Sequence, residues 1–411
     1  MRRSVIISAF ACDPDLPSEP TIGWEYLKTW LKIVESNDLE LIVFMNARSA
    51  IATRRRLAAE GLQSVKLEIR PVALPSVLRF LENPRLTRIE YLVWCRQVRR
   101  ILTSESFDGV LLARHVTFAS ELLPTPISAL TGATFRVWGP VGSSGEARAY
   151  LVEPRHPQWR RQYMIQRIRD GASALLARQH ARRVDLTLTT SNNLAERLER
   201  QGSQAAVFPN TRLTEDLLAH IQSSASRDAA KSRTEGAPTL LCVGNLITLK
   251  RFEVAIAALK DPRLKRAELR IIGKTLGGEN YLSDVARDLG VAERVTFLGQ
   301  VPRTVVLDEM ACADVVIHPS TREGASGVVG EATAIGTPVV CFAGTGGAAV
   351  LDFAQGSGIL IDAAQHDRSG LVATAIIDAL ELPRRASQVW FADRYGEFER
   401  YLLARAREGH E

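Results

Sequence analysis

The sequence predicts an α/β protein of two doubly wound domains, each built on a parallel sheet. Three observations indicate this class. The chain has 411 residues, which is enough for two or three domains of roughly 100–200 residues each. Short β-rich runs alternate with helix-length segments, as in parallel sheets covered by helices on both faces. A polar segment without large apolar residues, 223–238, lies near the middle and is typical of a flexible connection between domains.

The strands of the first half are expected at apolar runs separated by segments long enough for helices. These runs are 4–10, 39–44, 65–69, 109–113, 134–138, 186–190 and 205–208. In the second half the pattern is clearer, with runs at 239–243, 268–272, 294–298, 314–318, 338–342 and 358–361. Between them apolar residues recur at helical spacing, for example Val254, Ala258 and Leu259.

Domain limits follow from these runs. We expect an N-terminal domain over residues 1–210 and a C-terminal domain over 211–386. In the last segment, Phe391, Tyr395 and Phe398 recur at helical spacing. A final helix within 387–411 is therefore expected to pack back on the N-terminal domain.

Composition and charge narrow the classes of function. Hydrophobic residues make up 46% and charged residues 24%, which excludes bulk disorder. The 52 Lys and Arg against 46 Asp and Glu leave a net charge of +6, which permits anionic partners without choosing among them. Five widely separated cysteines fit a reduced, cytoplasmic protein better than a disulfide framework or a zinc site. No segment has the roughly 18 uncharged apolar residues that a membrane-spanning helix needs.

The strongest candidate site is the run 318–332, which leaves a buried strand, passes a glycine-rich turn and enters an apolar helix. Backbone N–H groups near Gly327 and Val328 are free at such a helix start, where the helix dipole favours an anion such as a diphosphate. The carboxylate of Glu331 is suited to accept hydrogen bonds from ribose hydroxyls, and Glu323 would face the attached group. The alternative is that these carboxylates only favour a helix N-terminus and the glycines only turn the chain.

The same run resembles a family signature. Residues 323–332, Glu-Gly-Ala-Ser-Gly-Val-Val-Gly-Glu-Ala, are similar to the Glu-x7-Glu motif of retaining family 4 glycosyltransferases, the glycosyl transferases group 1. Further segments resemble this family in order along nearly the whole chain: 18–24, 114–118, 138–142, 241–246 with Lys250, and 335–340. The resemblance implies the GT-B fold, in which two Rossmann-like domains face a central cleft. It also implies that the N-terminal domain binds an acceptor and the C-terminal domain a nucleotide sugar.

The resemblance carries a set of site residues. It implies that Lys250 binds the phosphates, that Glu323 orients the sugar, and that His115 steadies the sugar from the other domain. These three are the expected catalytic residues. The residues expected to bind the donor are Gly23, Gly244, Asn245, Lys250, Arg251, Leu298, Gly324, Ala325, Ser326, Gly327, Val328 and Glu331. Those expected at the acceptor are Trp138, Gly139 and Gly142.

One position departs from the family pattern. Asn245 stands where the family usually has arginine, and Arg251 stands where it usually has glycine. Asparagine donates hydrogen bonds but carries no charge, so half of the expected cationic clamp is missing. We expect Lys250 to supply the main phosphate charge, with Arg251 or Arg322 compensating.

The sequence thus favours a retaining, hexosyltransferase-like enzyme that moves a sugar from a nucleotide-diphosphate donor to a glycan or lipid-linked saccharide in bacterial polysaccharide or glycoconjugate synthesis. No metal, further cofactor or nucleic acid is expected. The alternatives are a nucleotide-sugar epimerase on the same fold and a non-catalytic nucleotide-sugar-binding subunit. The stretch 155–183 mixes arginines with apolar residues, which fits either peripheral contact with the inner face of the membrane or a solvated arginine face.

Overall fold

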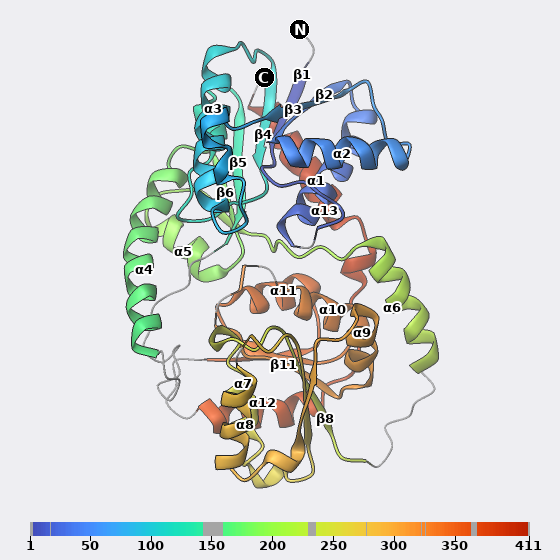
Figure 1. Ribbon diagram of the computed structural model, residues 1–411. Coiled ribbons are helices and arrows are strands. Elements are labelled where there is room, and N and C mark those ends of the chain that lie inside the picture. The colour runs from blue at the N-terminus through green and yellow to red at the C-terminus, as the bar shows by residue number, and fades with distance from the viewer. Residues whose placement is uncertain are drawn as a thin grey trace.

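The computed structural model describes residues 3–16, 18–142, 159–228, 236–276, 278–321, 323–324, 326–362 and 368–409. Two α/β domains lie one above the other, each with a sheet between helices (Figure 1). The upper, N-terminal domain has a seven-stranded sheet and the lower, C-terminal domain a six-stranded sheet. All strand pairs within the two sheets are parallel. The expected fold class is confirmed.

The N-terminal sheet has the order β3-β2-β1-β4-β5-β6-β7. Its strands are β1 (Arg3–Ser8), β2 (Leu39–Asn46), β3 (Leu67–Val72), β4 (Val110–His115), β5 (Phe135–Val141), β6 (Leu186–Thr189) and β7 (Ala205–Val207). Its helical segments are α1 (Glu19–Glu35), α2 (Ala47–Ala59), η1 (Ser76–Leu81), α3 (Thr87–Ser104), η2 (Pro126–Ala129), α4 (Trp159–Ala181) and α5 (Asn192–Arg200). Every residue of β4 is buried, because central parallel strands are covered on both faces.

The C-terminal sheet has the order β10-β9-β8-β11-β12-β13. Its strands are β8 (Thr239–Val243), β9 (Glu268–Ile272), β10 (Val295–Gly299), β11 (Val315–His318), β12 (Val339–Phe342) and β13 (Gly358–Ile361). Its helical segments are η4 (Thr248–Lys250), α7 (Phe252–Ala258), η5 (Pro262–Leu264), α8 (Glu279–Asp288), η6 (Ala292–Arg294), α9 (Arg303–Cys312), α10 (Gly327–Ile335), α11 (Gly346–Ala354) and α12 (Arg368–Leu380). The strand order reverses between β8 and β11, so the loops after these two strands diverge and leave a crevice at their carboxyl ends.

The chain passes between the domains twice. The first crossing leads from β7 to α6 (Glu215–Asp228), and residues 229–235 of the expected polar connection lie outside the described residues. The second passes through η7 (Gln388–Phe391) into α13 (Arg394–Glu408), which packs on the N-terminal sheet. There the buried Glu399 carboxylate pairs with Arg114 of β4 at 2.9 Å and accepts a hydrogen bond from Trp30 Nε1 at 3.1 Å.

Apolar and aromatic contacts fix these crossings. The Phe208 ring, just after β7, stacks on Phe398 of α13 at a centroid distance of 4.1 Å, and it meets Phe353 of α11 edge-on at 5.7 Å. The two domains therefore share a small aromatic cluster. In the ranges that the structure describes, no helix is both long and apolar enough to span a bilayer.

Candidate active site

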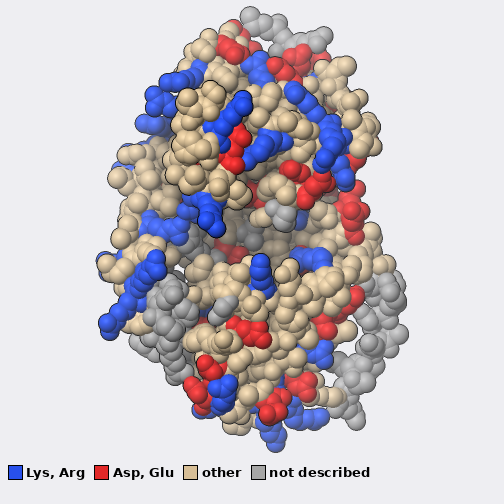
Figure 2. Space-filling view, viewed as in Figure 1, with Lys and Arg blue, Asp and Glu red and all other residues tan. Residues whose placement is uncertain are grey.

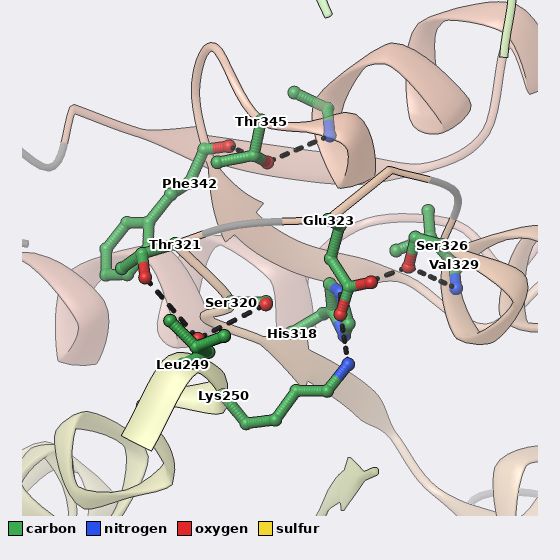
Figure 3. A network of polar contacts seen from close by, with 11 residues as sticks. Leu249, Lys250, His318, Ser320, Thr321, Glu323, Ser326, Val329, Phe342 and Thr345 are labelled. Atoms are coloured by element: carbon green, nitrogen blue, oxygen red, sulfur yellow. Dashed lines mark hydrogen bonds and ion pairs between the residues drawn. The ribbon is translucent and has the colours of Figure 1, made fainter. Parts of the chain in front are cut away.

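Two loops of the C-terminal domain meet at the carboxyl ends of the central strands. One follows β8 and contains η4, and the other follows β11 and leads into α10. The carbonyl of Leu249 accepts hydrogen bonds from Thr321 Oγ1 at 3.4 Å and from Ser320 Oγ at 3.3 Å (Figure 3). It also accepts one from the backbone N–H of Thr321 at 3.1 Å. These bonds hold the loops side by side at the point where a doubly wound sheet places its ligand.

Lys250 and Glu323 form an ion pair between these loops (Figure 3). Their side chains are only 17% and 14% exposed, so the pair lies in a recess. Gly244 follows β8 with a φ of 146°, and a Cβ there would lie 3.0 Å from Cε of Lys250. The glycine thus tolerates the left-handed backbone and leaves room for the lysine stem to reach Glu323.

His318 ends β11 beside this ion pair. Its Nε2 lies 3.0 Å from Ser326 Oγ and 3.6 Å from Glu323 Oε1. Burial, with a smaller contribution from the charge of Lys250, lowers the pKa of His318 to about 3. The imidazole is therefore neutral near pH 7, where it positions the loop and does not act as a cationic acid.

Two helices begin next to Glu323. Ser326 caps α10, because its Oγ accepts a hydrogen bond from the N–H of Val329 at 3.4 Å. Thr345 caps α11 in the same way. A Cβ on Gly346 would collide with the backbone carbonyl of Glu323, so glycine is required where α11 approaches this loop. Two helix N-termini therefore converge on one recess, and both favour an anion there.

Glu331 lies in the second turn of α10 and is 1% exposed. Its Oε1 pairs with the guanidinium of Arg303, the first residue of α9. Its Oε2 is buried and has no hydrogen-bond partner in the described part of the chain. A buried carboxylate oxygen without a partner is costly, so this atom is suited to a ligand that brings a hydroxyl donor.

The N-terminal domain comes close to this site at Gly142. A Cβ on Gly142, just after β5, would lie 3.9 Å from Cα of Gly324. Gly142 also forms a bridge with Ser120 in the loop after β4. The carboxyl ends of the two sheets thus face each other, and the surface is hollowed between the domains (Figure 2). A ligand held at Glu323 would lie within reach of both.

Three residues expected at the site are buried within the N-terminal domain. His115 is fully buried, with Nδ1 2.8 Å from Thr125 Oγ1 and Nε2 2.8 Å from the carbonyl of Thr117. Burial lowers its pKa to about 3, so His115 is neutral near pH 7 and engaged on both ring nitrogens. Trp138 and Gly139 are also buried, and the Trp138 ring packs in a small cluster with α4 and α5. The described contacts bring none of the three to the C-terminal loops.

Gly23, one of the residues expected to bind the donor, has a packing role in the structure. Gly23 lies inside α1, and a Cβ there would collide with the carbonyl oxygen of Ala11, so this glycine lets α1 approach the loop after β1. Glu19, at the start of the same helix, accepts a hydrogen bond from the N–H of Phe118 at 3.1 Å. Burial raises the pKa of Glu19, and that hydrogen bond opposes the rise. The carboxylate fixes the loop after β4, which faces the C-terminal domain.

The remaining residues expected to bind the donor differ in their exposure and in their partners. Asn245 is exposed, whereas Arg251 is 2% exposed and its guanidinium pairs with Glu253. Leu298 and Val328 are half-buried on β10 and α10. Two further positions, Arg322 and Ala325, lie outside the described residues. Of the two arginines expected to compensate for Asn245, Arg251 therefore already pairs with another carboxylate.

The comparison with protein-family models agrees with the geometry of the site. The family model described as "Glycosyl transferases group 1" matches residues 225–389, which contain both loops of the site. Residues 225–389 belong to the glycosyl transferases group 1 family. The expected resemblance is thereby confirmed for the domain that holds Lys250, Glu323 and Glu331.

Curated relatives match over a similar length. A GDP-mannose-dependent alpha-(1-6)-phosphatidylinositol monomannoside mannosyltransferase of Mycolicibacterium smegmatis is 34% identical over 169 residues, covering 38% of this chain and 42% of that protein. D-inositol 3-phosphate glycosyltransferase 2 of Catenulispora acidiphila is 35% identical over 159 residues, covering 36% of each. The match thus spans less than half the length of either relative.

Solved structures extend the likeness of the fold to both domains. A lipopolysaccharide outer core galactosyltransferase in its apo form aligns with a TM-score of 0.61 at 13% identity, covering 98% of this chain and 99% of that one. Sucrose-phosphate synthase from Thermosynechococcus elongatus aligns with a TM-score of 0.57 at 17% identity, covering 98% and 95%. The architecture of the chain is the GT-B fold.

Arg303 was missed by the sequence analysis, although it contacts the second glutamate of the motif. One feature of the sequence could have pointed to Arg303. A cation at the first position of a helix opposes the helix dipole, so an arginine there calls for a partner elsewhere in the fold. The identity of that partner, Glu331, lies 28 positions along the chain and needs the tertiary structure.

Proposed function

We propose that the protein is a retaining glycosyltransferase that moves a sugar from a nucleotide-diphosphate donor to a glycan or lipid-linked acceptor. The observation that carries the proposal is the convergence at one recess of two helix starts, the Lys250–Glu323 ion pair and a buried glutamate, one oxygen of which has no partner among the described residues. Helix starts and a lysine favour the diphosphate, and the two carboxylates favour hydroxyl groups.

Each group has a part in the proposed reaction. The bond between the anomeric carbon and the phosphate oxygen breaks, the acceptor oxygen forms the new bond on the same face, and the acceptor proton passes to the departing phosphate. Negative charge gathers on the diphosphate as it leaves. Lys250 and the N-termini of α10 and α11 therefore stabilise the transition state more than the bound donor. Glu323 orients the sugar hydroxyls and Glu331 the ribose.

The relatives suggest donors and acceptors to test. The relative from Mycolicibacterium smegmatis is named for GDP-mannose and phosphatidylinositol monomannoside, and the one from Catenulispora acidiphila for D-inositol 3-phosphate. We propose a role in bacterial polysaccharide or glycoconjugate synthesis on this basis. No metal ion has a step in the proposed reaction, so turnover should persist in EDTA.

Peripheral membrane contact is part of the proposal. Helix α4 exposes Met164, Ile168 and Leu175, which are 57%, 68% and 59% exposed. Arginines accompany them, and Figure 2 shows basic side chains along the left edge of the view, where α4 lies. Apolar and basic side chains on one helix suit the surface of an anionic bilayer. Residues 155–158 of the expected stretch lie outside the described residues. Binding to vesicles with anionic lipid, but not to neutral vesicles, would support the contact, and binding to neither would remove it.

The test is a thermal-shift screen with UDP, GDP and their sugars, followed by product analysis with and without acceptor. Selective binding should raise the melting temperature by mass action. Transfer that depends on an acceptor, with retained anomeric configuration, supports the proposal. Conversion of the nucleotide sugar without acceptor would indicate an epimerase instead. Donor binding without turnover over a panel of acceptors would indicate a binding subunit.

A further inference from the structure

The two glutamates of the motif are each held by one cation. Lys250 pairs with Glu323, and Arg303 pairs with Glu331. The second pair lies beside the start of α10: a Cβ on Gly327 would lie 3.7 Å from Glu331 Oε1 and 4.0 Å from a terminal nitrogen of Arg303. Arg303 therefore lies beside the helix start at which the proposed function places the diphosphate, and Lys250 pairs with a carboxylate in the loop that leads into this helix.

The placement of Arg303 is unfavourable for its own helix. It is the first residue of α9, whose first turn contains no acidic residue to offset the opposing dipole. The side chain is half exposed, so the guanidinium is open to a ligand from the solvent. A guanidinium has five N–H donors, which lets it bind phosphate oxygens through two parallel hydrogen bonds.

Among the described residues of the two site loops, Lys250 is the cation placed to bind a phosphate. Asn245 carries no charge, and Arg251 is buried against Glu253. The diphosphate of a nucleotide sugar bears two negative charges near pH 7, whereas Lys250 supplies one positive charge. Meanwhile Glu331, which the proposed function assigns to the ribose, is partly occupied by Arg303 in the free protein.

We propose that Arg303 is the second cation of the diphosphate site and that it changes partner when the donor binds. In the free protein the guanidinium holds Glu331. In the complex the phosphate oxygens take the guanidinium, and the ribose hydroxyls take Glu331, including its unpartnered Oε2. This inference rests on the proposed function and names the residue that replaces the missing arginine at position 245.

If Arg303 changes partner in this way, substitutions at Arg303 and at Glu331 should have opposite effects on binding of the phosphates and of the ribose. Removing the guanidinium should weaken binding of the phosphates and free Glu331 for the ribose. Removing the charge of Glu331 should free the guanidinium for the phosphates and weaken the grip on the ribose. A residue that contacts only the base, or that only supports the fold, would not give this crossed pattern.

The test measures binding of inorganic pyrophosphate, of UDP and GDP, and of uridine and guanosine to the full chain by calorimetry and competition. Arg303→Gln should weaken pyrophosphate and the preferred diphosphate by about tenfold or more, the lower end for a charge-assisted hydrogen bond. Its affinity for the matching nucleoside should be unchanged or tighter. Arg303→Lys should retain part of the phosphate affinity, because it keeps the charge but loses the planar fork. Glu331→Gln should bind pyrophosphate severalfold more tightly and the nucleoside more weakly.

Arg287→Gln is the matched control, because Arg287 is an exposed arginine on α8 whose partner is Asp284. It should leave every affinity within twofold. If Arg303→Gln leaves pyrophosphate and diphosphate binding unchanged, or weakens nucleoside and diphosphate equally, the inference is wrong. The result for Arg303→Gln is informative even if Glu331→Gln does not fold. Arg303 is half exposed, so its replacement should leave the fold intact. If the wild-type protein binds neither diphosphate nor pyrophosphate, the proposed function itself fails.

Discussion

Replacing Lys250 by methionine tests the charge that the account places on the leaving group. Methionine keeps most of the side-chain length and removes the ammonium. In the structure the ammonium pairs with Glu323 in a recess, with the two side chains 17% and 14% exposed. The substitution therefore removes a phosphate partner and leaves a carboxylate without its cation next to the proposed diphosphate.

The expected loss is worked from that geometry. A charge-assisted hydrogen bond contributes about 1.5–3 kcal/mol, which is about 10–150-fold in affinity. Because Lys250 already has a carboxylate partner in the free protein, we expect the lower end, about tenfold, for binding of the diphosphate. The loss in kcat should be larger, about 10²–10³-fold, since charge on the diphosphate grows as the sugar departs.

Calorimetry with UDP or GDP, whichever binds, and rates of acceptor glycosylation measure the two effects. Adding Glu323→Gln to Lys250→Met should recover part of the binding loss, because no unpaired carboxylate then faces the phosphates. The double-mutant cycle should give a coupling energy of about 1 kcal/mol or more. If Lys250→Met keeps its diphosphate affinity within twofold and its kcat within threefold, Lys250 has no part in the site.

The other predictions concern folding. His318 has a pKa of about 3 in the folded protein against 6.5 when unfolded, so only the unfolded chain binds this proton as the pH falls below 6.5. The unfolding free energy of His318→Gln should therefore fall less steeply between pH 6 and pH 4 than that of the wild type, by about 1.4 kcal/mol per pH unit; an equal slope would contradict this. Gly23→Ala should destabilise by about 1–3 kcal/mol through overpacking, whereas Gly171→Ala, in open space on α4, should stabilise by about 0.5–1 kcal/mol in thermal unfolding. Equal effects would refute the close approach at Gly23. Glu399→Gln should cost about 3–5 kcal/mol in denaturant unfolding, and joint replacement of Arg114 and Glu399 by Met and Leu should recover most of it. A cost near zero would mean that this buried pair does not hold α13 to the sheet.

The fold was predictable from the sequence because parallel strands covered on both faces are short, continuous apolar runs. All thirteen expected strands are present, with ends that differ by a few residues. The position of the Glu323 loop was also accessible, since ligand loops of doubly wound sheets follow the central strands. Neither inference needs to know how distant side chains pack.

The orientation of individual side chains was harder to predict from the sequence. His115 lies at the end of β4, where a histidine can face either the cleft or the core. Its ring is held in the core by Thr125 and Thr117 and lies near Tyr91 of α3, contacts that depend on how η2 and α3 pack on the sheet. The pairing of Arg251 with Glu253 instead of a phosphate depends on a left-handed backbone at Arg251, with a φ of 54°.

A crystal structure of the protein with the nucleoside diphosphate that stabilises it most is the direct test of the central claim. The diphosphate should lie at the N-terminus of α10, within hydrogen-bond distance of Lys250 Nζ and the backbone N–H of Gly327 or Val328. The ribose should lie against Glu331. A nucleotide bound away from this helix start, or one whose phosphates point out of the space between the domains, would contradict the account.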